Sequence, residues 1–137
     1  MTGEGTRIVA ATDIRWKKNT TGVTIVKNTV VKLDATEDLI VLPTATTDHL
    51  YGVTMEDIPT GAKGGDVQVR GRACCRADGV LAVPGILLMS DAAGRVTTWA
   101  AAGGTNAQVV GQLEDTAGAL DDVIMVELAG PGVIKQG

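Results

Sequence analysis

The chain has 137 residues, a mass of 14.0 kDa and a net charge of −4, and 45% of its residues are hydrophobic although only three are aromatic. This length corresponds to one domain, and a charged fraction of 20% with a mean hydropathy of +0.18 argues against intrinsic disorder. The 42 β-branched residues (17 Val, 8 Ile and 17 Thr) fit pleated, half-buried surfaces and therefore predict an all-β protein.

In chain order, the sequence divides into an arm, a β-rich body and a tail. We expect residues 1–19 to form an extended N-terminal arm, residues 20–129 a single β domain and residues 130–137 a C-terminal tail. Apolar runs separated by turn residues predict strands near residues 23–26, 29–33, 39–42, 50–55, 66–75, 80–83, 86–90, 95–99, 108–113 and 122–128. Ala117–Asp122 is long enough for one helical turn. Closely spaced strands of this kind are typical of a compact β-barrel or sandwich.

The two halves of the body resemble each other at an offset of about 57 residues. Three landmarks recur in order: an apolar strand ending in Asp-Ala, a Gly ahead of Glu-Asp, and an acidic turn that opens an alternating strand. They match Gly22–Ala35 to Gly79–Ala92, Tyr51–Asp57 to Val110–Asp115, and Gly65–Val69 to Asp121–Met125. The pattern predicts an internal duplication into two similar β-modules, at about residues 20–77 and 78–129.

Few residues in this chain are suited to catalysis. It has one His (His49) and one Ser (Ser90), and Ser90 lacks the G-x-S-x-G turn that exposes a nucleophile. A zinc site needs three or four nitrogen or sulfur ligands, and only His49 and two cysteines are available. Acidic pairs such as Glu56-Asp57 are more typical of solvated turns than of acid–base catalysis. We therefore expect no enzyme, no metal and no cofactor.

Neither a membrane span nor a signal peptide is predicted. The longest nearly apolar run, Val80–Met89, contains Pro and Gly and falls well short of the roughly 20 residues that cross a bilayer. The first residues lack the basic-then-apolar order of a signal peptide, which favours synthesis in a reducing cytoplasm. Cys74 and Cys75 are adjacent and make no disulfide framework; we expect small strand residues, with a vicinal bridge as the rarer alternative.

Positive charge is concentrated at the start of the chain. Residues 1–32 carry six basic and two acidic residues, a net charge of +4, whereas residues 33–137 carry six basic and fourteen acidic residues, a net charge of −8. This split suggests that the leading segment attaches to an acidic surface, with a solvated arm as the alternative. Nucleic acid is a weaker candidate, because three aromatics offer no stacking platform and the acidic body repels phosphate.

Several stretches resemble the small capsid cement, or head decoration, proteins of tailed bacteriophages. The resemblance covers about four-fifths of the chain and is carried by strands and turns: Gly22–Ala35, Leu50–Asp57 (LYGVTMED), Gly65–Gly71 (GDVQVRG), Gly85–Gly94 and Val110–Asp115. The chain departs from the family pattern at Val83-Pro84-Gly85, where the family tends to have a Gly-Asp turn, and at the adjacent cysteines.

The resemblance implies a structural protein that binds the outer surface of an assembled phage head. Such proteins are β-rich, commonly form homotrimers and bridge neighbouring major capsid subunits against the pressure of the packaged DNA. The implied partners are the major capsid protein and other copies of this chain, with no direct nucleic acid and no membrane. The implied location is the outer capsid surface of the virion, after synthesis in the bacterial host cytoplasm.

Two sets of side chains are candidates for these contacts. An aromatic residue flanked by positive charge in the leading segment is the expected anchor on the capsid; the set is Arg7, Ile8, Arg15, Trp16, Lys17 and Lys18. Trp16 as a buried core residue is the alternative. The second set, Arg70, Arg72 and Arg76, is a candidate for contacts between protomers, with a solvated strand face as its alternative.

A ligand-binding β-module from a phage fibre or adhesin is the competing hypothesis. A module of this class would recognise carbohydrate or a host surface. Carbohydrate sites stack sugars on exposed aromatic rings, and only Trp16, Tyr51 and Trp99 are available for that purpose.

Overall fold

The computed structural model describes residues 13–34, 38–44, 49–100 and 106–136, and its regular structure consists of β-strands throughout these ranges. The strands are β1 (Asp13–Asn19), β2 (Val30–Leu33), β3 (Leu39–Val41), β4 (Leu50–Thr54), β5 (Gly61–Arg70), β6 (Arg72–Asp78), β7 (Leu87–Ser90), β8 (Val96–Thr98), β9 (Asn106–Gln108), β10 (Gly111–Leu113), β11 (Leu120–Leu128) and β12 (Ile134–Gln136). The predicted all-β class is confirmed.

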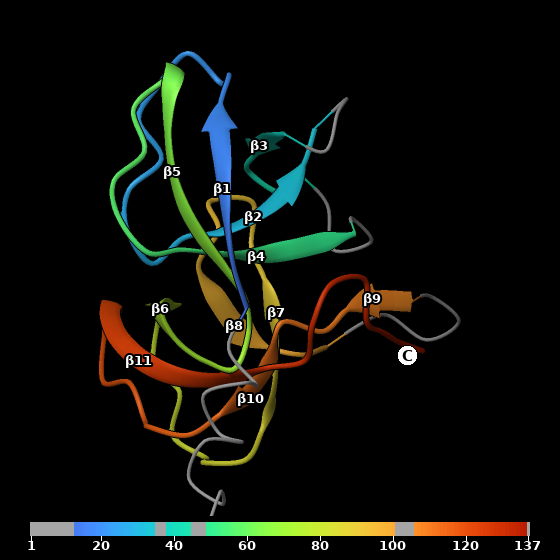
Figure 1. Ribbon diagram of the computed structural model, residues 1–137. Helices are drawn as coiled ribbons and strands as arrows, with labels where there is room; N and C mark the ends of the chain where they lie inside the picture. The colour runs from blue at the N-terminus through green and yellow to red at the C-terminus, as the bar shows by residue number, and fades with distance from the viewer. Residues whose placement is uncertain (1–12, 35–37, 45–48, 101–105, 137) are drawn as a thin grey trace, which may run out of the picture.

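The strands form two closed five-stranded barrels that follow one another along the chain (Figure 1). The first barrel has the order β1-β3-β2-β4-β5, and the second is built from β6, β7, β8, β10 and β11. In both, the first strand pairs in parallel with the third and antiparallel with the fifth, while the fourth strand joins the second to the fifth. Because every pairing recurs, the predicted duplication is a duplication of the whole barrel.

The register of the duplication differs from the sequence alignment at its third landmark. Thr54 of β4 lies opposite Val67 of β5, and Leu113 of β10 lies opposite Val126 of β11. Val67 therefore corresponds to Val126, three residues beyond the Val123 that the alignment assigned to it. A register shift between Leu120 and Val123 places one extra residue at the start of β11 and contributes to this displacement.

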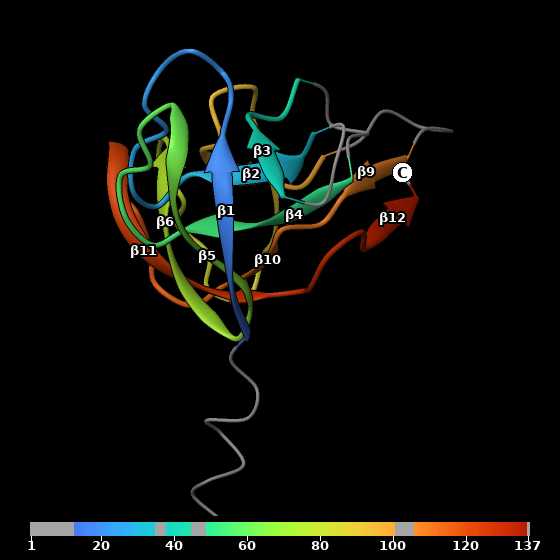
Figure 2. The same ribbon diagram turned by 45° about the horizontal axis from the view of Figure 1, so that its top comes forward.

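The expected arm, tail and module boundary are corrected by the strand assignments. Asp13–Asn19 is not part of an arm; it forms β1 and closes the first barrel against β3 and β5. Ile134–Gln136 in the expected tail forms β12, which pairs with β9 in a two-stranded ribbon beside the barrels (Figure 2). The single strand expected over residues 66–75 is divided at Gly71 into β5 and β6, so the modules meet there. Residues 1–12 lie outside the described ranges.

The connections also differ from the expected strands in one repeated detail. Residues 23–26 and 80–83 form single bridges, Ile25 with Ile58 and Leu81 with Ala117, and both bridges carry paired backbone hydrogen bonds of 2.8–3.0 Å. The expected helical turn at Ala117–Asp122 is a tight turn in which the Asp122 carboxylate accepts hydrogen bonds from two backbone amides.

The larger of two hydrophobic clusters contains side chains from both barrels. One cluster inside the first barrel contains Ile25, Val31, Ile40, Ile58 and Val67. The larger cluster fills the second barrel and also takes in Val30, Leu50 and Val53 from the first. Burying these side chains at about 25 cal/mol per Å² of apolar surface stabilises the two barrels as one body.

Hydrogen bonds and a close backbone contact complete the seam between the barrels. The Val30 amide donates to the Gly94 carbonyl at 2.8 Å, and the Arg76 guanidinium donates to the Thr29 hydroxyl at 2.9 Å. Gly94 has φ +77°, and a Cβ at this position would overlap both the Thr29 methyl group and the Val30 carbonyl oxygen. The seam therefore requires glycine here for space as well as for backbone conformation.

Gly94→Ala should destabilise the protein by more than Gly85→Ala. Both glycines have positive φ, so each substitution carries a backbone cost of about 1 kcal/mol. A Cβ at Gly94 would overlap the other barrel, whereas a Cβ at Gly85 meets nothing within 4 Å. Gly94→Ala should therefore cost roughly 1–3 kcal/mol more than Gly85→Ala, because it overpacks the seam. Thermal unfolding followed by circular dichroism measures the difference. Equal losses of stability in the two variants would contradict the seam described above.

Candidate contact surface

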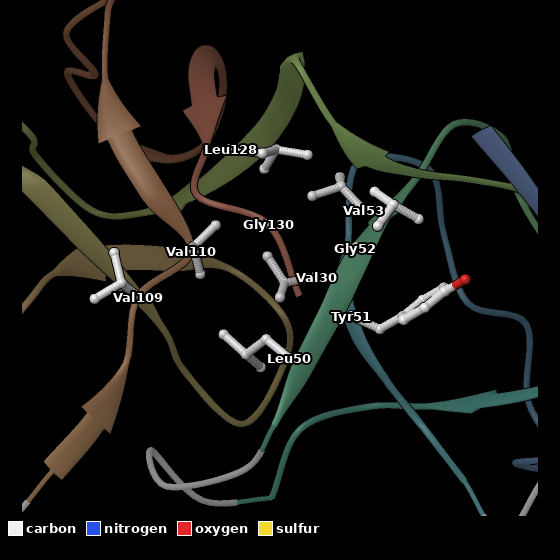
Figure 3. Close-up of a pocket in the computed structure, with 10 residues that line it drawn as sticks. Val30, Leu50, Tyr51, Gly52, Val53, Val109, Val110, Leu128 and Gly130 are labelled. Atoms are coloured by element: carbon white, nitrogen blue, oxygen red, sulfur yellow. The ribbon is translucent and has the colours of Figure 1, made fainter. Parts of the chain in front are cut away.

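The apolar hollow between the barrels at Val30, Leu50 and Val110 is too small to be a ligand site. It is lined mostly by apolar side chains from both barrels, including Val30, Leu50 and Val53 on one side and Val109, Val110 and Leu128 on the other (Figure 3). Its cavity volume is about 10 Å³, which is about the space of one water molecule. Function is therefore to be sought on the outer surface.

The residues considered for catalysis are not assembled into a reactive centre. The Ser90 hydroxyl is buried and donates to the Asp91 carbonyl at 2.8 Å, whereas His49 is exposed ahead of β4. Within the described ranges no group of three or more His, Cys, Asp or Glu is placed to hold a metal ion, and no helix could span a membrane. Cys74 is exposed and Cys75 is buried, and both are free thiols, so the vicinal bridge is not formed.

The outer face of β1 presents an exposed apolar pair next to a cation. Ile14 and Trp16 are 47% and 48% exposed, and as alternate residues of one strand they point to the same side. The Trp16 indole lies against Gly64 of β5, where a Cβ would overlap the ring. The Lys18 ammonium lies 5.7 Å from the ring centroid, a cation–π distance. Trp16 is thus a surface residue fixed in place by its own barrel, not a core residue.

Lys17 is not available as a contact residue, in contrast to the prediction. Its side chain points to the opposite side of β1 from Trp16, and the residue is only 8% exposed. Its ammonium lies 5.1 Å from the centroid of the Tyr51 ring, whose π face stabilises the charge. Arg7 and Ile8, also predicted as contacts, lie outside the described ranges.

Arg15 is exposed but engaged with its own strand. Its guanidinium donates two hydrogen bonds to the Asp13 carboxylate, at 2.8 and 2.9 Å, and Arg70 donates a third at 3.1 Å. The hydrogen bond from Arg15 is the main cause that lowers the pKa of Asp13, and the charge of Arg70 adds to it. Of the predicted cations on β1, Lys18 is the one that accompanies the exposed tryptophan.

The three arginines predicted to join protomers all form ion pairs within the chain. Arg70 pairs with Asp13 at 3.1 Å, Arg72 with Glu114 at 2.8 Å, and Arg76 with Asp121 at 3.1 Å. Arg70 ends β5 and Arg72 begins β6, so they do not share a strand face. Arg76 also reaches Thr29 across the seam, which makes it a structural contact between the barrels.

All three aromatic rings have a lysine ammonium nearby: Lys18 lies over Trp16, and the same arrangement recurs at Trp99 and Tyr51. The Lys135 ammonium lies 4.1 Å from the Trp99 ring centroid, and the Trp99 indole N–H donates to the Ala107 carbonyl at 3.3 Å. Tyr51 is covered by Lys17 in the same manner. A sugar could not stack on the Tyr51 or Trp99 ring without displacing a lysine ammonium. This weakens the carbohydrate hypothesis.

Ile14 and Gly64 belong to the candidate surface and were missed from the sequence. The alternation of Ile14, Trp16 and Lys18 was a usable signal, because residues two apart share a strand face. The contribution of Gly64 had no local signal, since it reaches Trp16 only through the pairing of β1 with β5.

The structure defines the class of fold: two fused copies of a five-stranded barrel with an accessory β-ribbon. No protein-family model matches the chain, and no curated protein matches it in sequence. Among solved structures, the chain is similar to the N base of head fiber gp8.5 of bacteriophage phi29, with a TM-score of 0.63 and 11% sequence identity. The match covers 89% of this chain and 98% of the solved N-base chain, so the two share a fold over nearly the whole of both chains.

A group of charges beside the seam makes the stability of the protein dependent on pH. A hydrogen bond between the Asp78 and Asp91 carboxyl groups is the main cause that raises the pKa of Asp78, with burial and the charge of Asp91 adding to it. A raised pKa means that the folded state holds the proton more tightly than the unfolded state. The resulting stabilisation is present below the ordinary value of 3.8 and is lost as the pH rises through the raised pKa.

Asp78→Asn should therefore raise the melting temperature at pH 7, by roughly 1–3 °C for an exposed pair, because an amide can donate to Asp91 without carrying a charge. The gain should shrink as the pH falls below the ordinary carboxyl pKa. Asp115→Asn makes the same charge change in an exposed turn and should show no such trend. Melting curves between pH 3 and pH 8 give the comparison; a gain that does not vary with pH would contradict the carboxyl–carboxylate pairing.

Proposed function

We propose that this chain is a structural protein of a bacteriophage head, which binds the outer surface of the assembled capsid and bridges neighbouring major capsid subunits as a decoration protein. The observation that supports this most is the fold shared with the phi29 head fiber base over 89% of the chain. The resemblance of the sequence to cement proteins points to the same setting. In this proposal the protein has no catalytic activity and requires no cofactor.

The outer face of β1 is the proposed capsid contact. Trp16 and Ile14 supply apolar surface that is exposed in the isolated chain, and a tryptophan buried at the centre of an interface commonly carries a large share of the binding energy. Gly64 and the neighbouring Lys18 hold the ring in one position, so little side-chain freedom is lost on binding. Lys18 adds a positive charge for an acidic capsid surface.

Rigidity is the property that the fused barrels contribute. A protein that bridges two capsid subunits resists their separation only if its own body does not extend. The common core and the Arg76 and Gly94 contacts join the barrels into one unit. Several copies acting together would add their individually weak contacts through effective concentration.

Trp16→Ala should weaken capsid binding while leaving the fold intact. Removing an interface tryptophan costs about 2 kcal/mol or more, so the Kd should rise about 30-fold or more. Val80→Ala, which trims an exposed apolar side chain on the second barrel, should bind as the unchanged chain does. The measurement is co-sedimentation with capsids that lack this protein, with circular dichroism as the test of folding. Equal binding by all three proteins would contradict the proposed β1 contact.

The contribution of the leading residues, including Arg7 and Ile8, is tested by deleting residues 1–12 only. A longer deletion would remove β1 and open the first barrel. We expect the shortened chain to fold and to bind capsids more weakly. Unchanged occupancy would assign the contact to the barrels themselves.

Self-association is the second part of the proposal. A homotrimer would have a mass of about 42 kDa, three times the 14.0 kDa of one chain. Light scattering coupled to size-exclusion chromatography measures this mass directly. A mass of one chain, both free in solution and on detachment from capsids, would contradict the trimer but leave the capsid contact standing.

A further inference from the structure

A second hollow lies at the seam between the barrels, and we call it the seam groove. Its volume is about 220 Å³, enough for a small group of side chains and far larger than the hollow in Figure 3. The first barrel contributes Lys27, Asn28, Val53, Thr54, Met55 and Gln68, and the second contributes Arg72, Ala73 and Cys74. None of these residues belongs to β1, so the seam groove is separate from the proposed capsid contact.

The lining of the seam groove is positive on a body that is otherwise acidic. Lys27 and Arg72 carry charge, and no Asp or Glu is among the lining residues. The Lys27 ammonium has no ion-pair partner among the described residues; only its backbone amide is engaged, by Asp57 at 2.7 Å. The whole chain carries a net charge of −4, so two cations with no acidic residue in the same lining mark a place where an anion is favoured.

Arg72 can exchange its present partner for a ligand. It contacts Glu114 at 2.8 Å, but its side chain is 62% exposed, and exposed ion pairs contribute little stability. A carboxylate that also reaches Lys27 would meet two cations instead of one. The exchange therefore favours a ligand that brings its own negative charge into the seam groove.

The walls of the seam groove are fixed before any ligand arrives. The buried Gln68 amide donates to the carbonyls of Arg70 and Arg72, at 3.0 and 2.6 Å, and so ties the end of β5 to the start of β6. The Arg76 amide donates to the Asn28 carbonyl at 3.2 Å, which ties the Lys27–Asn28 turn to the second barrel. Binding would therefore cost little conformational entropy in the protein.

We propose that the seam groove binds an acidic peptide segment of a protein partner. One carboxylate of the segment lies between Lys27 and Arg72, and the aliphatic part of its side chain packs on Met55 and Ala73. The seam groove recognises its ligand by charge and by the size of the groove, whereas the β1 face contacts its partner through an aromatic side chain. A chain with both can hold a partner at two points.

Cys74 provides a direct readout because it lines the seam groove and is exposed. Burial raises the pKa of the neighbouring Cys75 thiol to about 12, so Cys75 stays protonated and unreactive. Alkylation by neutral iodoacetamide therefore reports on Cys74, with Cys74→Ser as the blank. No capsid is needed, so the outcome is independent of the proposed capsid binding.

Hexaglutamate should slow the alkylation of Cys74 in the folded chain in a saturable way, by about tenfold when the peptide is present at about ten times its Kd. Hexaglutamine should not slow it, because it lacks the charge. Hexathymidylate should not slow it either, since a single-stranded nucleic acid finds no aromatic platform among the lining residues. Protection by hexathymidylate equal to or stronger than that by hexaglutamate would replace the acidic peptide with a nucleic acid and overturn the proposal.

The variant Lys27→Gln/Arg72→Gln should lose the protection by hexaglutamate. The matched control, Lys63→Gln/Arg70→Gln, makes the same charge change at residues that do not line the seam groove and should keep it. If the double variant does not fold, Lys27→Gln alone serves, because Lys27 is exposed and its ammonium pairs with no carboxylate in the described part of the chain. Absence of protection in the unchanged chain, or equal protection in the groove variant and the control, would overturn the proposal.

Discussion

The packing of one barrel into the core of the other is the constraint on which the rest of the molecule depends. Val30, Leu50 and Val53 are strand residues of the first barrel, yet they complete the hydrophobic cluster of the second. The two barrels therefore share apolar contacts, and a Cβ at Gly94 would overlap Thr29 and Val30 of the first barrel. The stiffness of the body and the fixed walls of the seam groove both follow from this common core.

The two barrels have the same strand pairings, but the side chains on their outer faces differ. Trp16 pairs with Asp66 on the first barrel, and the matching position on the second barrel is Cys74, which pairs with Met125. The same strand face thus presents an exposed indole on one barrel and a thiol beside the positively charged seam groove on the other. The strand pairings are thus common to both barrels, whereas the exposed side chains at matching positions differ.

The sequence predicted what depends on local pattern and missed what depends on long-range pairing. The alternation around Val67 and Val69 identified a strand, and the recurring Gly ahead of Glu-Asp identified the duplication. Both signals are visible within a few residues of sequence. Asp13–Asn19 was expected in an arm because residues 1–19 contain no turn pair; the strand β5 with which it pairs begins more than forty residues later. Lys17 was expected at the surface for its charge, but it is buried with its ammonium over the Tyr51 ring. The partners of Arg70, Arg72 and Arg76 were likewise set by the folded chain.

In the proposed function, this pair of barrels lies on the outside of a phage head with β1 turned toward the capsid. Cryo-electron microscopy of capsids incubated with the protein tests it most directly. We expect additional density of the two-barrel shape on the outer surface, bridging neighbouring capsid subunits, with Trp16 buried at the contact. Capsids without added density, or density in which β1 faces the solvent, would contradict it.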